Sequence, residues 1–160
     1  MNMAISLEMP AHAEILHICR NLCDDQIQES IAQGWNESFD PEFVANHIHG
    51  FGGIKHVFRA KDGEPYCVAG YVPILPAVCE SWMLATPKWM DHVMEVTRTS
   101  RRVMKHILMT TQFKRLQTVA LASRTRAHEW YGTMGLKQEG VMRRMGRAGE
   151  DFIMFARVDQ

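Results

Sequence analysis

Apolar residues recur at helical spacing in the first fifty positions of the chain. Residues 11–22 carry four of them on one predicted helix face: Ile15, Ile18, Cys19 and Leu22. The short apolar segment over residues 3–9 predicts a first strand. Asp24 or Asp25 is expected to cap a second helical segment that ends at Gly34.

A third helix is predicted after Asp40, and the pattern then changes to strands. Asp40 is a favourable N-cap and Pro41 suits the first turn, so this helix is expected to run to about His49 and to stop at the glycines that follow. Apolar and polar residues then alternate with period two. This predicts an antiparallel meander of three strands, over residues 54–60, 66–74 and 78–85. The Asp-Gly pair ending at Gly63 supplies the positive φ of a tight turn.

The second half of the chain predicts a strand–helix–strand unit and a closing hairpin. A long helix carries an apolar stripe at steps of three and four residues: Val93, Val96, Thr97, Ser100, Val103, Met104, Ile107 and Leu108. The apolar run over residues 116–122 predicts a buried strand parallel to the one before the helix. A short helix over residues 126–134 and a hairpin of residues 136–145 with 151–158 complete the chain.

This order of elements resembles the Gcn5-related N-acetyltransferase (GNAT) fold. Residues 118–140 are similar to the family's pattern of a strand, an Asn or Ser, Ala-x-x-x-Tyr-x-x-x-Gly-Phe and a second strand with a glycine. The matching positions are Ser123, Ala127, Tyr131, Gly135, Leu136 and Gly140. The resemblance covers residues 54–158, and the first fifty residues only in outline. It implies one α+β domain over residues 1–160, with a mixed, splayed sheet and helices on both faces.

The segment that would bind the cofactor departs from this family. In GNAT proteins a Gln/Arg-x-x-Gly-x-Gly/Ala turn offers backbone N–H groups to the pyrophosphate of acetyl-CoA at the start of the long helix. Here residues 87–95 are PKWMDHVME, and no glycine lies between Gly70 and Gly132. Asp91 and Glu95 suit the first turn of a helix but would repel a pyrophosphate. The loop therefore predicts a normally starting helix and argues against a standard coenzyme A site.

Acetyl transfer from a thioester to an amine needs a proton acceptor for the amine and a proton donor for the departing thiolate. The resemblance places Tyr131 in the position of the general acid. Glu80, in the third meander strand, is a candidate general base, and strand alternation puts it on one face with Trp82 and Leu84. The alternatives are that Tyr131 only packs under the sheet and that Glu80 is an exposed strand residue.

The resemblance also implies a surface for acetyl-CoA along the third strand and the long helix. Its candidate residues are Leu84, Ala85, Thr86, Arg98, Arg101 and Ser123. The two arginines are candidates to bind the 3′-phosphate of coenzyme A or another anion. Alternatively, they lie on a solvated helix face.

Composition narrows the class of protein. With 160 residues, 46% of them hydrophobic and 22% charged, the chain is typical of one soluble domain that folds without metal or disulfide. No apolar run approaches the ~20 residues of a membrane span, and the cysteines and histidines show no standard zinc spacing. Residues 1–80 carry 4 Lys or Arg and 11 Asp or Glu, whereas residues 81–160 carry 14 Lys or Arg and 7 Asp or Glu. Either the two oppositely charged halves attract each other, or the basic second half offers a surface to an anionic ligand. The arginines near the C-terminus lack the interleaved aromatics of a nucleic-acid platform.

Two functions fit these patterns. One is an acetyl-CoA-dependent N-acetyltransferase whose amine acceptor, a small molecule or a protein, is left open. The other is a catalytically silent GNAT-like structural or interaction protein. The methionine-rich composition and the unusual loop are also similar to small GNAT-like proteins of tailed phages, which implies a virion or accessory role. Without a secretion signal we expect a cytoplasmic location, which for a phage protein means the host cytoplasm or the virion. An exposed strand edge near Pro73 or at the last hairpin would support a homodimer.

Overall fold

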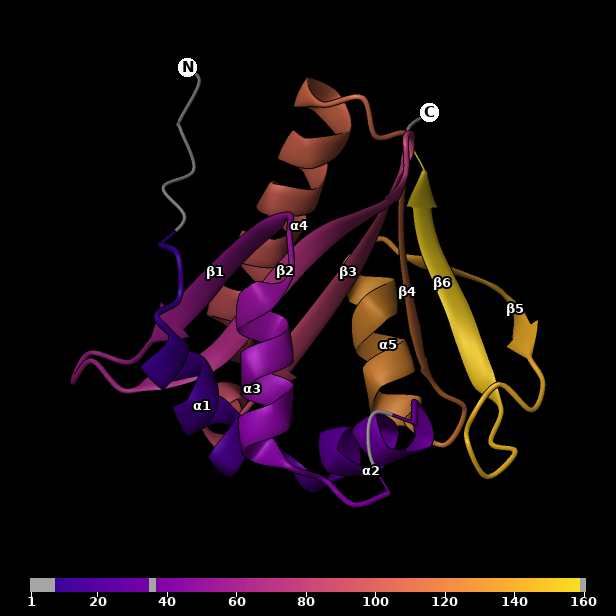
Figure 1. Ribbon diagram of the computed structural model, residues 1–160. Helices are drawn as coiled ribbons and strands as arrows, with labels where there is room; N and C mark the ends of the chain where they lie inside the picture. The colour runs from indigo at the N-terminus through magenta and orange to yellow at the C-terminus, as the bar shows by residue number, and fades with distance from the viewer. Residues whose placement is uncertain (1–7, 35–36, 159–160) are drawn as a thin grey trace.

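The computed structural model describes residues 8–34 and 37–158, which form a mixed six-stranded sheet with helices on both faces (Figure 1). The strands are β1 (Ile54–Arg59), β2 (Pro65–Leu75), β3 (Val78–Ala85), β4 (Arg115–Leu121), β5 (Lys137–Met142) and β6 (Phe152–Val158). The helices are α1 (His12–Arg20), α2 (Asp24–Ala32), α3 (Pro41–Gly50), the short 3-10 helix η1 (Pro87–His92), α4 (Val93–Thr110) and α5 (Thr125–Thr133). The predicted α+β class is confirmed, whereas the strand expected over residues 3–9 lies almost wholly outside the described residues.

The sheet has the order β1-β2-β3-β4-β6-β5 and opens in its middle. Strands β1, β2 and β3 form the predicted antiparallel meander, and β4, β6 and β5 form a second antiparallel group. The two groups are joined by the parallel pair of β3 and β4. This pair extends only from Val78 opposite Arg115 to Glu80 opposite Gln117. Beyond Glu80 the carboxyl ends of the two strands diverge, so the splayed sheet expected from the element order is present.

The two faces of the sheet are covered by different helices, as Figure 1 shows. Helices α1 and α3 pack on one face, where Trp82 and Leu84 of β3 join their apolar cluster. Helices α4 and α5 cover the other face, where Cys79 of β3 packs with the buried stripe of α4. The alternation predicted along β3 and the stripe predicted along α4 are therefore confirmed.

Side-chain hydrogen bonds at both of its ends explain where helix α3 begins and stops. The Asp40 carboxylate accepts a hydrogen bond from the Phe43 N–H at 3.1 Å and caps α3, as predicted. At the other end of α3, the buried Lys55 ammonium donates to the carbonyls of Ile48, His49 and Phe51, at 3.2, 2.8 and 2.6 Å, and so satisfies its exposed C-terminal carbonyls.

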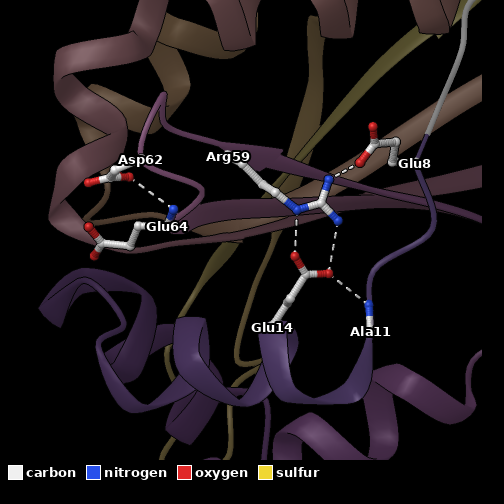
Figure 2. A network of polar contacts seen from close by, with 6 residues as sticks. All are labelled: Glu8, Ala11, Glu14, Arg59, Asp62 and Glu64. Atoms are coloured by element: carbon white, nitrogen blue, oxygen red, sulfur yellow. Dashed lines mark hydrogen bonds and ion pairs between the residues drawn. The ribbon is translucent and has the colours of Figure 1, made fainter.

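A charged network ties α1 to the end of β1. Figure 2 shows the Arg59 guanidinium lying against the Glu14 carboxylate, with Nε–Oε1 and Nη2–Oε2 distances of 2.5 and 3.1 Å. Glu8 is a further partner of the same guanidinium. Glu14 also accepts the Ala11 N–H at 2.9 Å, at the start of α1. A bidentate pair that is also held by a backbone donor fixes the position of α1 over the sheet.

Helix α2 straddles the opening between β3 and β4. At its start, the Cys23 N–H donates to the Ala85 carbonyl at 3.0 Å, at the end of β3. Further along the helix, the Glu29 carboxylate accepts the Leu121 N–H at 2.9 Å, at the end of β4. Glu29 is also paired with Arg124, at 2.8 Å, and Arg124 with Asp25, at 2.9 Å. The helix therefore satisfies backbone groups that the divergence of the two strands leaves without a strand partner.

Gly70 and Pro73 both lie inside β2 and have different roles there. The register between β2 and β3 shifts between Pro73 and Leu75, so a bulge does lie there. Gly70 is in regular register between Lys55 and Trp82. Its lack of a side chain makes room for the Trp82 indole, since a Cβ on Gly70 would lie 2.3 Å from the indole Cζ2. Gly70 therefore marks a close approach of the indole to the backbone, and the bulge lies at Pro73.

Substituting Gly70→Ala is expected to destabilise the protein by about 1–3 kcal/mol, because the Trp82 indole must move out of a packed layer. The apparent melting temperature should fall by several degrees in a thermal unfolding scan. Gly140→Ala is the matched control, since a Cβ on this strand glycine meets nothing within 4 Å. Equal melting temperatures for the two variants would contradict the packing role assigned to Gly70.

Candidate active site

Two cavities meet where the sheet opens. The smaller one has a volume of about 290 Å³ and lies among α2, α3, β3 and β4. The larger one, of about 770 Å³, lies between η1 with the start of α4 on one side and α5 on the other. Three residues line both of them: Gln26, Met83 and Tyr131. A group bound in one cavity therefore faces a group bound in the other across these side chains.

Tyr131 stands at this junction because α5 follows β4 directly. Its ring packs edge-on against Phe155, at a centroid distance of 5.3 Å, so the side chain is also part of the core beneath the sheet. Burial raises the pKa of the Tyr131 phenol to about 12, with a further rise from the Glu29 carboxylate and opposing effects of Arg124 and Thr118. The phenol is therefore protonated at neutral pH, which is the form that a proton donor requires.

Glu80 lines the smaller cavity from the last position of β3 that still pairs with β4. Its carboxylate accepts a hydrogen bond from Gln117 Nε2 at 3.4 Å, and the amide oxygen of Gln117 accepts the Arg115 Nε–H at 2.8 Å. Glu80 forms no ion pair within the parts of the chain that the structure describes. The two predicted catalytic residues thus line one cavity, and the Glu80 carboxylate is half-buried there with its negative charge uncompensated.

Gln26 bridges α2 and the free end of β3 through its side-chain amide. Its Oε1 accepts the Ala85 N–H at 2.8 Å, and its Nε2 donates to the Met83 carbonyl at 3.4 Å. The side chain is 6% exposed. It therefore occupies the backbone donor and acceptor that an amide-containing ligand running along β3 would use.

The predicted cofactor residues are not all brought to the larger cavity. Ser123 lines it, whereas Leu84 lines the smaller one. Ala85 and Thr86 are buried, and the Ala85 N–H and carbonyl are already hydrogen-bonded to Gln26 and Cys23. The arginines predicted to bind a phosphate, Arg98 and Arg101, lie on the exposed face of α4 and line neither cavity.

The glycine-free segment forms an apolar wall of the larger cavity. It begins as η1 and not directly as the long helix, and it contributes Pro87, Trp89, Met90 and Val93. Trp89 packs edge-on against Trp130 of α5 across this space, at a centroid distance of 5.3 Å. Glu95 accepts a hydrogen bond from the Tyr66 hydroxyl at 3.3 Å. The segment therefore offers the larger cavity apolar and aromatic surface in place of a glycine-lined anion cradle.

Sequence reasoning missed the contribution of α2 to both cavities. Gln26 and Glu29 reach partners 59 and 92 positions away along the chain, so no local spacing reveals them. A weak signal exists, because Gln26 lies four residues after the buried, apolar Leu22 and yet is polar. Thr118, which also acts on the Tyr131 phenol, was likewise not singled out.

This arrangement is the GNAT acetyltransferase fold. One similar solved structure is a GNAT-family acetyltransferase from Bacillus anthracis, at 10% identity and a TM-score of 0.69 over 92% of this chain and 88% of that one. Another is a variant of the spermidine N-acetyltransferase from Vibrio cholerae, at 14% identity and a TM-score of 0.69 over 96% and 95%. A third is the ribosomal-protein-S5-alanine acetyltransferase from Vibrio fischeri, at 12% identity and a TM-score of 0.65 over 96% and 92%.

The likeness lies in the structure and not in the sequence. No protein-family model and no curated protein matches the chain. Within residues 8–34 and 37–158, no group of three or more His, Cys, Asp or Glu side chains is arranged to hold a metal ion. No helix among those residues has the length and apolar character of a membrane span.

Proposed function

We propose that this protein transfers an acetyl group from acetyl-CoA to a primary amine. The observation that supports this is the meeting of the two cavities at Tyr131 in the opening of the sheet. An acceptor in the smaller cavity and a thioester at the inner end of the larger one would face each other there. The neighbouring structures named spermidine and ribosomal-protein-alanine acetyltransferases share the fold on which this opening depends.

In this proposal Glu80 and Tyr131 handle the two protons of the reaction. Glu80 accepts a proton from the ammonium, directly or through one water, and the amine nitrogen then forms a bond to the acetyl carbonyl carbon. The carbon–sulfur bond breaks, and Tyr131 donates its phenolic proton to the sulfur. The amide nitrogen then loses its second proton to the Tyr131 phenolate, and Glu80 releases its proton to solvent. Acetyl-CoA supplies the activated acetyl group. The products are an N-acetyl amine and free coenzyme A.

The larger cavity fits the slender arm of acetyl-CoA better than it fits the pyrophosphate. Its Trp89, Met90 and Trp130 side chains offer apolar contact, and Ser123 and Thr125 at the start of α5 offer polar contact to the arm. Amides of the arm would have to displace the Gln26 side chain to reach the backbone of β3. The residues present are therefore compatible with acetyl-CoA but do not form the anion cradle described for the family.

A catalytically silent scaffold is the second candidate function, and Gln26 is the observation that favours it. A side-chain amide that fills the free backbone positions of β3 closes the opening with the protein's own atoms. A protein without a ligand at this place would gain stability from such a contact. The virion or accessory role expected from the sequence belongs to this second candidate and stays a prediction. The homodimer is a separate prediction that either function allows.

Titration with acetyl-CoA separates the two functions. If the chain is an enzyme, we expect micromolar affinity by calorimetry, and at a concentration of 100 Kd a stabilisation of about 2.7 kcal/mol. For a chain of 160 residues this corresponds to a rise in melting temperature of about 5–10 °C. Adenosine 3′,5′-bisphosphate, which keeps the phosphorylated nucleotide but lacks the arm that the larger cavity would hold, is the control for non-specific effects. A flat calorimetric trace together with an unchanged melting temperature would reject the acetyltransferase function.

A further inference from the structure

The smaller cavity has one uncompensated charge and a largely apolar wall, and this combination points to a particular kind of acceptor. We propose that the acceptor is a small primary amine that carries a single positive charge on a compact apolar body, such as an arylalkylamine. The ammonium would lie against Glu80 and the apolar body against α3 and the outer part of β2. This inference rests on the proposed acetyl transfer, since it assigns the substrate class of the same site.

Only one of the two carboxylates in the smaller cavity is available to a ligand. Glu29 already pairs with Arg124 and accepts the Leu121 N–H, so its charge is compensated. Among the residues that the structure describes, Glu80 receives one long hydrogen bond from Gln117 and pairs with no cation. No Lys or Arg is among the described residues that line this cavity. One uncompensated carboxylate matches one ammonium, and a second ammonium in the same ligand would have no such partner there.

Most of the rest of the wall is suited to hydrocarbon, and its polar groups are Gln26, Ser30, Gln33, Ser81, Thr118 and Tyr131. Apolar side chains reach the cavity from α3 and from three strands: Val44, Ile48, Phe51, Val72, Ile74, Trp82, Leu84 and Val119. Trp82 is held in place by its packing over Gly70, so this part of the wall is rigid. Each apolar group that a ligand buries against it gains free energy by leaving water. A polyamine chain with charges spaced along it would lose this gain, because a charge would lie against apolar surface.

The size of the cavity limits the ligand further. A volume of about 290 Å³ corresponds to roughly ten water-sized groups, taking about 30 Å³ for each. An amine with one ring and a two-carbon linker is of this size. A longer ligand would have to extend past Ile74, which is exposed at the end of β2.

Binding of four ligands to the full chain without acetyl-CoA tests the charge and the apolar body separately. By calorimetry, 2-phenylethylamine should bind at least about tenfold more tightly than ethylamine, which lacks the apolar body, and than 2-phenylethanol, which lacks the charge. It should also bind more tightly than spermidine, which carries additional charges. Equal or tighter binding of spermidine, or no binding of 2-phenylethylamine, would overturn the inference.

Two variants localise the ammonium. Glu80→Gln should weaken 2-phenylethylamine binding about ten- to a hundredfold and should leave the affinity for 2-phenylethanol nearly unchanged. The matched control Glu42→Gln removes one carboxylate that pairs with Arg20 and does not line the cavity, so it should not alter either affinity. Melting temperatures of both variants confirm that they are folded. An unchanged amine affinity in folded Glu80→Gln would place the ammonium elsewhere and overturn the inference.

The same ligands distinguish failure of this inference from failure of the proposed function. Selective binding of 2-phenylethylamine with no acetyl transfer from acetyl-CoA would support the ligand class of the smaller cavity and reject the enzyme. Acetylation of spermidine, or of a peptide N-terminus, at a higher kcat/KM than 2-phenylethylamine would support the enzyme and reject this acceptor class.

Discussion

Tyr131→Phe is expected to lower kcat for acetyl transfer about 10²- to 10³-fold, with acetyl-CoA affinity changed by less than about threefold. The Tyr131 phenol lies at the junction of the two cavities and is held protonated there. It can therefore donate a proton to the departing thiolate. Its ring packing against Phe155 survives the substitution, because only the hydroxyl is removed. Steady-state kinetics and calorimetry on the same preparation provide the two readouts.

Tyr71→Phe is the matched control for this variant. Tyr71 is a buried tyrosine of β2 that belongs to the same α4-side core but lines neither cavity. Removing its hydroxyl should leave kcat within about twofold, with at most a modest change in melting temperature. If Tyr131→Phe retained wild-type kcat, Tyr131 would be excluded from the mechanism. Parallel losses in both variants would show that the effect comes from core packing and not from proton transfer.

The largest effect on stability is expected from pH, through His56. This residue of β1 is 2% exposed, lies against the rings of Phe58 and Tyr71 at 5.0 and 6.2 Å, and has no hydrogen-bond partner for either ring nitrogen within the described residues. Burial lowers the pKa of the imidazole from 6.5 to about 4. The folded state thus holds this side chain neutral, under the helix α4 that starts at the candidate site.

The sign of the effect follows from proton binding. Between pH 6.5 and 4 the unfolded chain binds a proton at His56 that the folded chain does not, so stability falls as the pH falls through this window. Below pH 4 protonation of His56 in the unfolded chain lowers the free energy of unfolding by about 3 kcal/mol in total. About 2 kcal/mol of this is already lost at pH 5. The contribution is constant above pH 6.5. Urea unfolding at pH 7.5, 6, 5 and 4 measures it.

His56→Phe should remove most of this loss between pH 6.5 and 5, because phenylalanine keeps a planar ring and does not titrate. The exposed carboxylates whose pKa values lie below their usual range, such as Glu42 and Glu139, lose their favourable pairing only at lower pH, so they do not obscure this window. His106→Gln, which replaces an exposed imidazole of α4, is the control and should leave the slope unchanged. If the unfolding free energy of His56→Phe fell with pH as steeply as that of the wild type, His56 would not be the cause of the pH dependence.

Local patterns in the sequence determined most of the elements, because each element depends on residues close to it along the chain. Asp40 and Pro41 define the start of α3, and strand alternation predicts the bounds and the two faces of β3. The boundaries that differ have tertiary causes. Strand β5 ends at Met142, before the predicted 145, because the turn that follows places Arg144 at a positive φ and ties its N–H to Asp151 at 2.8 Å.

The sequence by itself determined the fold class, the order of the elements and two of the side chains in the opening, Glu80 and Tyr131. Only the tertiary structure decided that α2 crosses this opening, that Gln26 fills the free end of β3, and that Glu29 is compensated while Glu80 is not. The reason is physical. Periodicity and capping act over a few residues, whereas the unpaired backbone groups of a diverging sheet are satisfied by whatever side chain the fold brings near, here from more than fifty positions away.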